Sequence, residues 1–437
     1  MNKVYADAAL KSDALKHFEI TSAEGQSPLQ AARKAAAEVL ASVDFPSTKD
    51  EEWKYTNVKK LVSKAFNFDL QGTVTEAQLA EAQIEGLEAN KLVFVNGQYN
   101  EALSNIVEQD KVVVSTLSAA AENNAQLVAT HFGKYAVQEE QPFTALNTAL
   151  AADGVFVHVP RSKVLELPVF ILNVVDTTAG DVIAQPRNLI VVEENAQATL
   201  IENSITIGEN TGFVNAVTEI VVETRAVVDH YKIQTEGENA FHVSTSHTKQ
   251  ADNSNYSNTT ITTGGKMIRN NLNIDLGEHC EAYMNGLYFL DGKSHADNHT
   301  TVDHQKPNSY SNELYKGLLD GNSTGVFNGK IYVREGAQKT NAFQSNKNIL
   351  LSEHANVDTK PQLEIWADDV SCSHGCTVGA LDEDPLFYLR ARGISEEKAR
   401  ALLMFAFAGD VLEKIKVPAL KSYIEKIIAA RLNYELI

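Results

Sequence analysis

Apolar and polar side chains alternate along the middle of the chain. Every second residue is apolar in three short runs: Leu272, Ile274 and Leu276; Ile331 and Val333; Leu363 and Ile365. A period of two places the apolar set on one face of a β-strand. No amphipathic helix of ordinary length interrupts residues 188–360, which argues against strands that alternate with helices. The pattern therefore predicts a mainly β core built from many short strands.

A second pattern recurs where one strand ends and the next begins, with a charged residue followed by small or polar ones. It is found at Glu194–Ala196, Thr224–Ala226, Gly277–His279, Glu335–Ala337 and Glu353–Ala355. Residues 188–360 also hold 22 asparagines and a single proline, and asparagine tolerates left-handed corners and can stack in ladders. Corners of this kind favour a parallel β-helix. An antiparallel β-sandwich is the alternative.

Helical patterns flank this core on both sides. The first 45 residues and the interval 118–150 have apolar residues at helical spacing, and the same holds for Ser395–Lys414 and for the segment from Pro418 to Leu432. The chain is thus expected to divide into three parts: a mainly helical N-terminal domain with a few strands (1–150), a β-helix core (151–380) and a C-terminal helical domain (381–437).

Composition and charge narrow the setting in which the protein works. With 43% hydrophobic and 22% charged residues, the chain has the composition of a globular protein. A net charge of −19 argues against nucleic acid and anionic membranes as partners. The longest apolar run, Leu165–Val175, is shorter than a membrane span and contains Pro168. Three cysteines are too few for a disulfide framework and indicate a reducing compartment. We therefore expect a soluble, cytoplasmic protein.

The C-terminal part differs in charge from the rest. Residues 386–437 carry nine Lys and Arg against six Asp and Glu. Four apolar residues are candidates for a partner-binding stripe in this part: Leu386, Phe387, Leu402 and Phe405. Such stripes serve either as packing within the protein or as a surface for a partner helix. The sequence pattern leaves both interpretations open.

Common catalytic motifs are absent from the sequence. It contains neither a phosphate-binding glycine loop nor a dinucleotide fingerprint, a nucleophile elbow or a His-Glu-x-x-His site. Three histidines do gather in His295–His304, but on a strand His295 and His299 share one face and His304 lies on the other. Hydrogen bonding to nearby Asp or Asn side chains is the alternative to metal binding there.

The segment Asp368–Cys376 is the stronger candidate for chemistry. Cys372 and His374 lie on the same face of an extended segment, where a thiolate and an imidazole can bind a soft or borderline metal. Two or three ligands do not close a structural metal site, so the missing ligands would have to come from another chain. A buried thiol beside a hydrogen-bonded imidazole is the alternative.

Several long motifs resemble one known family. They are Lys49–Thr56, Asp297–His304, Ser311–Lys330, Asn341–Ser352, Pro361–Gly379 and Leu386–Ile394. These residues are closely similar to the SufB/SufD family, whose members are scaffold subunits of the SUF machinery for iron–sulfur cluster assembly. The similarity spans nearly the whole chain.

This resemblance implies a fold and a set of partners. The family fold is a right-handed parallel β-helix between helical N- and C-terminal domains. A SufD-like chain pairs with a SufB-like paralogue, and its C-terminal helices bind the SufC-like ATPase. By the same resemblance the protein is a non-catalytic scaffold that holds no stable cluster alone. A transient iron–sulfur cluster would form at the junction with the paralogue, near His374 and Cys372.

The resemblance also favours the SufD branch over the SufB branch. SufB receives persulfide sulfur on a cysteine, and the matching position here is Asn346, which cannot hold a persulfide. SufB also carries a His-Glu pair where this chain has His374 and Gly375. Cys376 departs from the alanine expected at its position, which leaves open whether it is an additional thiol ligand.

Two functions of other classes compete with a scaffold role. One is a β-solenoid enzyme that acts on carbohydrates, which would need paired carboxylates in a groove. The other is a structural homo-oligomer without metal chemistry. The sequence does not decide whether the isolated chain forms a homodimer or whether a complex of this chain binds reduced flavin.

Overall fold

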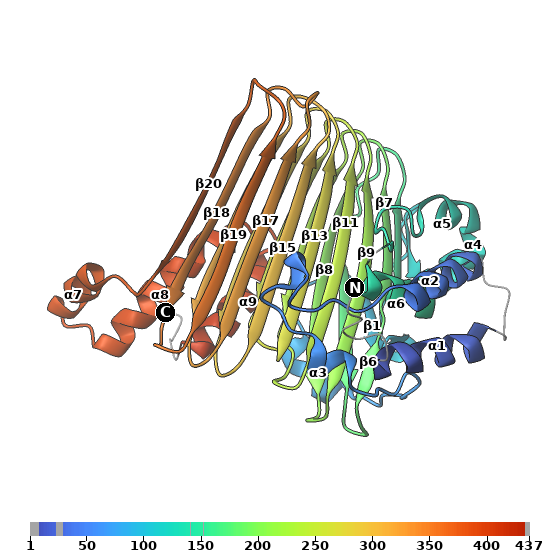
Figure 1. Cartoon of the computed structure of the whole chain (residues 1–437), viewed down its shortest axis with the longest axis horizontal. Helices are drawn as coiled ribbons and strands as arrows, with labels where there is room; N and C mark the ends of the chain where they lie inside the picture. The colour runs from blue at the N-terminus through green and yellow to red at the C-terminus, as the bar shows by residue number, and fades with distance from the viewer. Residues whose placement is uncertain (1–7, 23–28, 140, 152, 433–437) are drawn as a thin grey trace.

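The computed structural model describes residues 8–22, 29–139, 141–151 and 153–432 of the chain. Two ten-stranded sheets face each other and form a parallel β-solenoid (Figure 1). From residue 187 onward, successive strands belong alternately to the two sheets, so each coil of the solenoid contributes one strand to each sheet. The predicted mainly β, parallel solenoid is confirmed, and the antiparallel sandwich is excluded.

The first sheet has the strand order β2-β1-β5-β8-β10-β12-β14-β16-β18-β20. These strands are β1 (Asn90–Val95), β2 (Gln98–Tyr99), β5 (Val169–Asp176), β8 (Gln197–Ile207), β10 (Val227–Gln234), β12 (Asn255–Thr262), β14 (Glu281–Leu290), β16 (Tyr310–Leu319), β18 (Asn341–Leu350) and β20 (Ser371–Gly379).

The second sheet has the order β19-β17-β15-β13-β11-β9-β7-β4-β3, and β6 pairs with β9 beside this path. These strands are β3 (Val113–Thr116), β4 (Val155–Val159), β6 (Val182–Ala184), β7 (Arg187–Val192), β9 (Gly212–Val222), β11 (Phe241–Gln250), β13 (Met267–Leu276), β15 (His295–His304), β17 (Thr324–Val333) and β19 (Asn356–Ile365).

The coils stack because the same corner is repeated in each of them. Six corner residues have the left-handed backbone conformation: Asn195, Arg225, Asn253, His279, Asn308 and Lys339. The N–H of each donates a hydrogen bond to a carbonyl of the next coil, as from Asn195 to Thr224 at 3.0 Å and from Asn253 to Glu278 at 2.7 Å. A small, buried residue follows each corner, as Ala196 and Ala226 do. The recurrent corner pattern of the sequence is thus the signal of the solenoid.

The solenoid interior contains the predicted alternating residues. Leu272, Ile274 and Leu276 point inward and are at most 6% exposed, and Ile331 and Val333 are fully buried. Inward apolar side chains of both sheets form one continuous cluster. Burial of these residues is the main stabilising term of the core.

Helices cover the outer faces of the two sheets (Figure 1). They are α1 (Ala9–Ser22), α2 (Gln30–Ser42), α3 (Lys59–Val62), α4 (Leu117–Asn123), α5 (Ala125–His131), α6 (Pro142–Leu150), α7 (Glu383–Ala391), α8 (Glu396–Leu412) and α9 (Pro418–Arg431), with the 3₁₀ turns η1 (Glu51–Trp53), η2 (Glu76–Ala82) and η3 (Glu101–Leu103). α1, α2 and α6 pack on the second sheet around Phe213 and Phe241. α8 and α9 pack on the first sheet around Ile233, Ile261 and Leu287. In the described part of the chain, no helix is long and apolar enough to cross a membrane.

The predicted domain boundary near residue 150 does not separate the strands of the solenoid from those of the N-terminal part. β1 pairs in parallel with β5, and β3 pairs with β4, so strands from both sides of residue 150 share each sheet. The N-terminal part is therefore packed as an extension of the solenoid.

The N-terminal segment around η1 is fixed to the second sheet by a buried ion pair. Arg269 donates to Asp297 at 2.6 Å, and its guanidinium lies 4.1 Å from the ring of Trp53. Both charged side chains are at most 3% exposed. Asp297 also accepts a hydrogen bond from Thr56. This arrangement connects η1 with strands more than 200 residues later in the chain.

We expect Asp297→Asn to lower the free energy of unfolding by about 3 kcal/mol, because it leaves the buried Arg269 guanidinium uncompensated. The Arg269 charge holds the pKa of Asp297 well below its ordinary value. The stabilisation is therefore present above pH 4 and is lost as the pH falls, so the difference between the two proteins should shrink in acid. Urea unfolding at several pH values measures it. Glu51→Gln, which removes an exposed ion pair with Lys360, is the control. An equal loss of unfolding free energy in both variants would contradict a stabilising role of the buried Arg269–Asp297 pair.

Candidate functional site

The last coil of the solenoid, formed by β19 and β20, is open to solvent. β19 and β20 are the final strands of their sheets, and each pairs with one neighbouring strand only within the described residues. No residue of β20 is buried, whereas inward residues of β17 such as Ile331 and Val333 are fully buried. Figure 1 shows β20 at the left-hand edge of the solenoid, with no helix stacked against it in the direction of the coils. Exposed edges of this kind are sites of pairing with another chain.

Apolar side chains are exposed at this open end. Ile365 is 39%, Trp366 50% and Val378 47% exposed. The predicted alternation at Leu363 and Ile365 is present, but the apolar face that it creates is only partly covered. Patches of this kind mark interaction sites in folded proteins.

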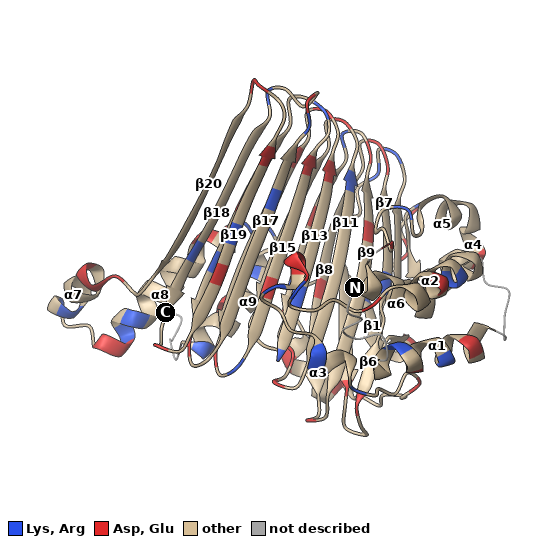
Figure 2. Cartoon of the chain, viewed as in Figure 1, with Lys and Arg blue, Asp and Glu red and all other residues tan. Residues whose placement is uncertain are grey.

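The edge strand also lacks the charges that usually protect an edge. Figure 2 shows β20 without a single acidic or basic residue, in contrast to β18 and β19. Natural proteins commonly place Lys or other charges on exposed edge strands to prevent pairing. β20 therefore lacks this common protection against pairing with another strand.

Three side chains with metal-binding capacity lie in one row of the last coil. Cys372, His374 and Cys376 pair in register with Ala342, Gln344 and Asn346 of β18: Ala342 is opposite Cys372, Gln344 opposite His374 and Asn346 opposite Cys376. All three residues of β18 are buried in the interior, so the row on β20 continues the inward side of the solenoid. Thr359 of the opposite sheet donates to the Cys376 Sγ at 3.1 Å. The prediction that Cys372 and His374 share a face is confirmed.

This row could supply part of a metal site. His374 is exposed and both thiols are half-buried. Burial raises the pKa of the Cys372 thiol, so it is protonated at neutral pH and loses its proton when a metal binds. Within the described residues, no three His, Cys, Asp or Glu side chains are grouped closely enough to hold a metal ion. Further ligands would have to come from whatever covers the open end.

Asn346 lies inside the solenoid, one coil below this row. Its Nδ2 donates to the Tyr288 hydroxyl at 3.0 Å, and its Oδ1 accepts from Asn348 at 2.7 Å. The side chain is fully buried. An amide has no sulfur to accept a persulfide, and here it is used in a hydrogen-bond network of the interior.

The histidines of β15 have other partners. His295 contacts the Thr56 hydroxyl at 2.8 Å, and His299 contacts Asp297 at 3.0 Å, both on the outer face. His304 lies on the inner face and contacts the Ser311 hydroxyl at 2.9 Å. The predicted division of the three between two faces is confirmed. Hydrogen bonds account for the positions of the His295 and His304 rings, and the contact with Asp297 accounts for that of His299.

The four candidate partner-binding residues of the C-terminal helices differ in exposure. Leu386 on α7 is 2% exposed, whereas Phe387 beside it is 75% exposed. Leu402 and Phe405 on α8 are half-buried, and Phe405 packs against the cluster that joins α8 to the first sheet. α7 extends away from the sheets beyond β20 (Figure 1). Phe387 is therefore the residue best placed to contact another protein, and Leu386 is a packing residue of the chain itself.

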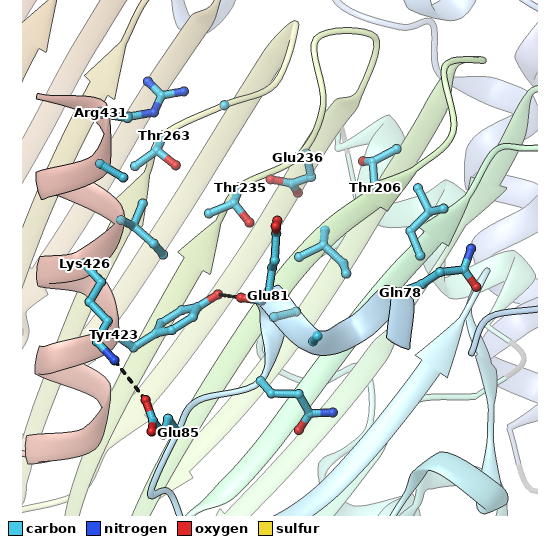
Figure 3. Close-up of a pocket in the computed structure, with 18 of the residues that line it drawn as sticks. Gln78, Glu81, Glu85, Thr206, Thr235, Glu236, Thr263, Tyr423, Lys426 and Arg431 are labelled. Carbon is cyan, nitrogen blue, oxygen red and sulfur yellow. Dashed lines mark hydrogen bonds and ion pairs between the residues drawn. The ribbon is translucent and has the colours of Figure 1, made fainter. Parts of the chain in front are cut away.

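A pocket of about 760 Å³ lies between η2 and α9, over the ends of β8 and β10 (Figure 3). Glu85 pairs with Lys426 of α9 at 2.9 Å, and the Tyr423 hydroxyl donates to the Glu81 carbonyl at 3.0 Å. The third acidic residue, Glu236, is paired with His242. These contacts tie the N-terminal segment to the last helix. Because two of its three carboxylates are already engaged by other side chains, Glu85 by Lys426 and Glu236 by His242, the pocket gives no support to the carbohydrate-enzyme alternative.

Comparison with known proteins assigns the chain to one family over nearly its whole length. The family model described as SUF system FeS cluster assembly, SufBD core domain, matches residues 174–407, and the SufBD protein N-terminal region matches residues 15–171. An iron–sulfur cluster assembly SufBD family protein of Synechocystis is 35% identical, with 96% of this chain and 94% of the relative aligned. The iron–sulfur cluster assembly protein SufD of Escherichia coli is 31% identical, with 96% and 97% aligned.

Fold and site together define a solenoid protein whose last coil is left open and presents thiol and imidazole groups. The chain belongs to the SufBD family of the SUF system for iron–sulfur cluster assembly. The resemblance to SufD seen in the sequence motifs is confirmed over nearly the whole chain. Family membership supports a role in iron–sulfur cluster assembly.

Proposed function

We propose that the protein is a non-catalytic scaffold subunit on which an iron–sulfur cluster forms only together with other chains. The open coil pairs with a SufB-like paralogue, and His374 and Cys372 contribute ligands to a nascent cluster at that junction. The cluster is transient, and the chain alone keeps none. The cytoplasm, which the cysteine content favours, is the proposed location.

The open last coil, with its uncharged edge strand β20, is the observation that carries this proposal. A closed solenoid would bury the row of Cys372, His374 and Cys376 or protect its edge with charges. Here His374 is exposed and the two thiols are half-buried, close to the exposed Ile365, Trp366 and Val378. A partner that buries these apolar side chains therefore also closes the ligand set. The name of the SufD relative, an iron–sulfur cluster assembly protein, agrees with this chemistry.

A SufC-like ATPase is the proposed partner of the C-terminal helices. α7 presents Phe387 and Tyr388, which are 75% and 57% exposed, in a part of the chain with a positive net charge. Exposed aromatic side chains on a projecting helix are frequent centres of protein interfaces. α8 and α9 pack on the first sheet. A movement of α7 imposed by the ATPase would therefore reach the solenoid through these two helices.

Charged residues at the open end test the pairing. Ile365→Lys and Val378→Lys together are expected to prevent recovery of the paralogue with the tagged chain, because unpaired charges would be buried in the interface. Both side chains are exposed, so the unfolding free energy of the chain itself should change by no more than about 0.5 kcal/mol.

Val107→Lys is the matched control, since Val107 is 48% exposed and lies on the N-terminal part of the molecule. It should leave the paralogue bound. Full recovery of the paralogue with the double variant would place the junction elsewhere. Loss of a homodimer of the isolated chain in the same variant would show that the open end also pairs with itself.

A further inference from the structure

A carboxyl group is buried inside the solenoid below the candidate site. Glu313 of β16 is 1% exposed. It lies opposite Gln344 of β18, and Gln344 lies opposite His374 of β20. The three side chains thus occupy one column across three adjacent strands, with His374 at the open end. Two strand spacings separate Glu313 from His374, which corresponds to about 10 Å.

The hydrogen bonds of Glu313 fit a carboxyl group that can be either neutral or charged. Thr300 donates to Oε2 at 2.7 Å, and Gln344 donates to the same oxygen at 3.0 Å. Oε1 has no partner among the described residues, nor has the Oε1 of Gln344. A proton on Glu313 Oε1 therefore breaks none of the existing bonds. No Lys or Arg pairs with this carboxyl group in the described structure.

Gly329 of β17 makes the reach of Gln344 possible. A Cβ atom at Gly329 would lie 2.1 Å from the Gln344 Nε2. Any larger residue would push the amide away from Glu313, so the contact depends on a glycine across the lumen. The column is therefore held by both sheets.

Four other titratable side chains nearby stay uncharged near neutral pH. Burial lowers the pKa of His304 to about 4 and raises the pKa values of the Tyr288 and Tyr315 hydroxyls well above the ordinary value. Burial also raises the pKa of the Cys372 thiol in the row above. Burial raises the pKa of Glu313 to about 7. Among these five groups, Glu313 is the one that changes charge in the physiological range.

We propose that Glu313 is an internal counter-charge for an iron ion held in the last coil. Below about pH 7 the carboxyl group is mostly neutral before iron binds, and it releases its proton to solvent when the ion arrives, so that part of the added positive charge is balanced inside the solenoid. This role rests on the proposed function, because it assumes iron at His374. At about 10 Å and an effective dielectric constant of about 20, a doubly charged ion should lower the pKa of Glu313 by about two units.

By thermodynamic linkage, ionisation of Glu313 must favour iron binding by the same free energy with which iron favours ionisation of Glu313. Ionisation of Glu313 should tighten iron binding about a hundredfold, and this gain should appear between about pH 5 and pH 7. Other groups at the site add their own pH dependence in every variant. The contribution of Glu313 is therefore the difference between the unmodified protein and Glu313→Gln.

Difference infrared spectroscopy of the complex with the paralogue tests the proposal, with Fe²⁺ under anaerobic conditions as the probe. The band of a protonated, buried carboxyl group should titrate near pH 7 without iron and near pH 5 with iron, and it should be absent in Glu313→Gln. Glu281→Gln, which removes an exposed carboxyl group on β14, should leave the band unchanged. If Glu313→Gln does not fold, Gly329→Ala assigns the band by shifting it.

A midpoint that does not move when iron is added would overturn the proposal. A shift that persists in His374→Ala would also overturn it, because the ion would then bind elsewhere. A shift that depends on His374 in a complex that never forms a cluster would instead keep the counter-charge and contradict the proposed function.

Discussion

Replacing His374 with alanine is expected to reduce the iron and acid-labile sulfide of the purified complex by about tenfold or more. A neutral imidazole can bind iron near physiological pH, and alanine cannot. The side chain is exposed on β20, so folding and assembly of the complex should be nearly unchanged. Cys372→Ala should have a smaller effect, because the proposed partner supplies the cysteine that receives sulfur.

The control for this prediction is His354→Ala. His354 is also exposed near the open end, but it precedes β19 and lies outside the row formed by Cys372, His374 and Cys376. Metal and sulfide analysis must be paired with a check that every subunit is present. Full cluster content in His374→Ala would remove the histidine from the site and leave it as a surface residue.

Replacing Phe387 with glutamate is expected to abolish co-purification of the ATPase. Truncation of an aromatic residue at the centre of an interface costs about 2 kcal/mol or more, which is about a thirtyfold loss of affinity, and a buried charge adds to this. Phe387 is 75% exposed, so the chain itself should keep its stability. Leu386→Glu is not an equivalent test, because Leu386 is 2% exposed and the change would disturb α7 itself.

Ile20→Glu is the matched control for Phe387→Glu. Ile20 is 66% exposed on α1, at the other end of the molecule. Recovery of the subunits in pull-downs, quantified for the ATPase and the paralogue separately, measures both variants. Retention of the ATPase by Phe387→Glu would exclude α7 as its contact.

The solenoid could be predicted from the sequence because its signals are local and repeated. The alternation at Leu272, Ile274 and Leu276 sets the inward face, and corner residues such as Asn195 and Arg225 recur once in each coil. The pattern between strands also showed that no helix interrupts them. The pattern did not show that β1 extends the first sheet of the solenoid and β3 the second. Pairing between strands that are distant in sequence leaves no local signal.

The candidate site was predictable only in part. The spacing of Cys372 and His374 placed them on one face, which the structure confirms. The open end was not predicted, because exposure depends on which coil comes last and not on the alternation of Leu363 and Ile365. The sequence did contain one signal of the open end, which is the absence of charged residues from β20. Glu313 could not be linked to His374 from the sequence, because the column depends on the register of three strands.

The measurement that tests the central claim most directly is purification of the tagged chain from its native cell under anaerobic conditions. The account predicts that a SufB-like paralogue and a SufC-like ATPase are recovered with it, and that iron and acid-labile sulfide are found in this complex but not in the chain alone. Recovery of the chain without either protein, or of a stable cluster on the isolated chain, would contradict it.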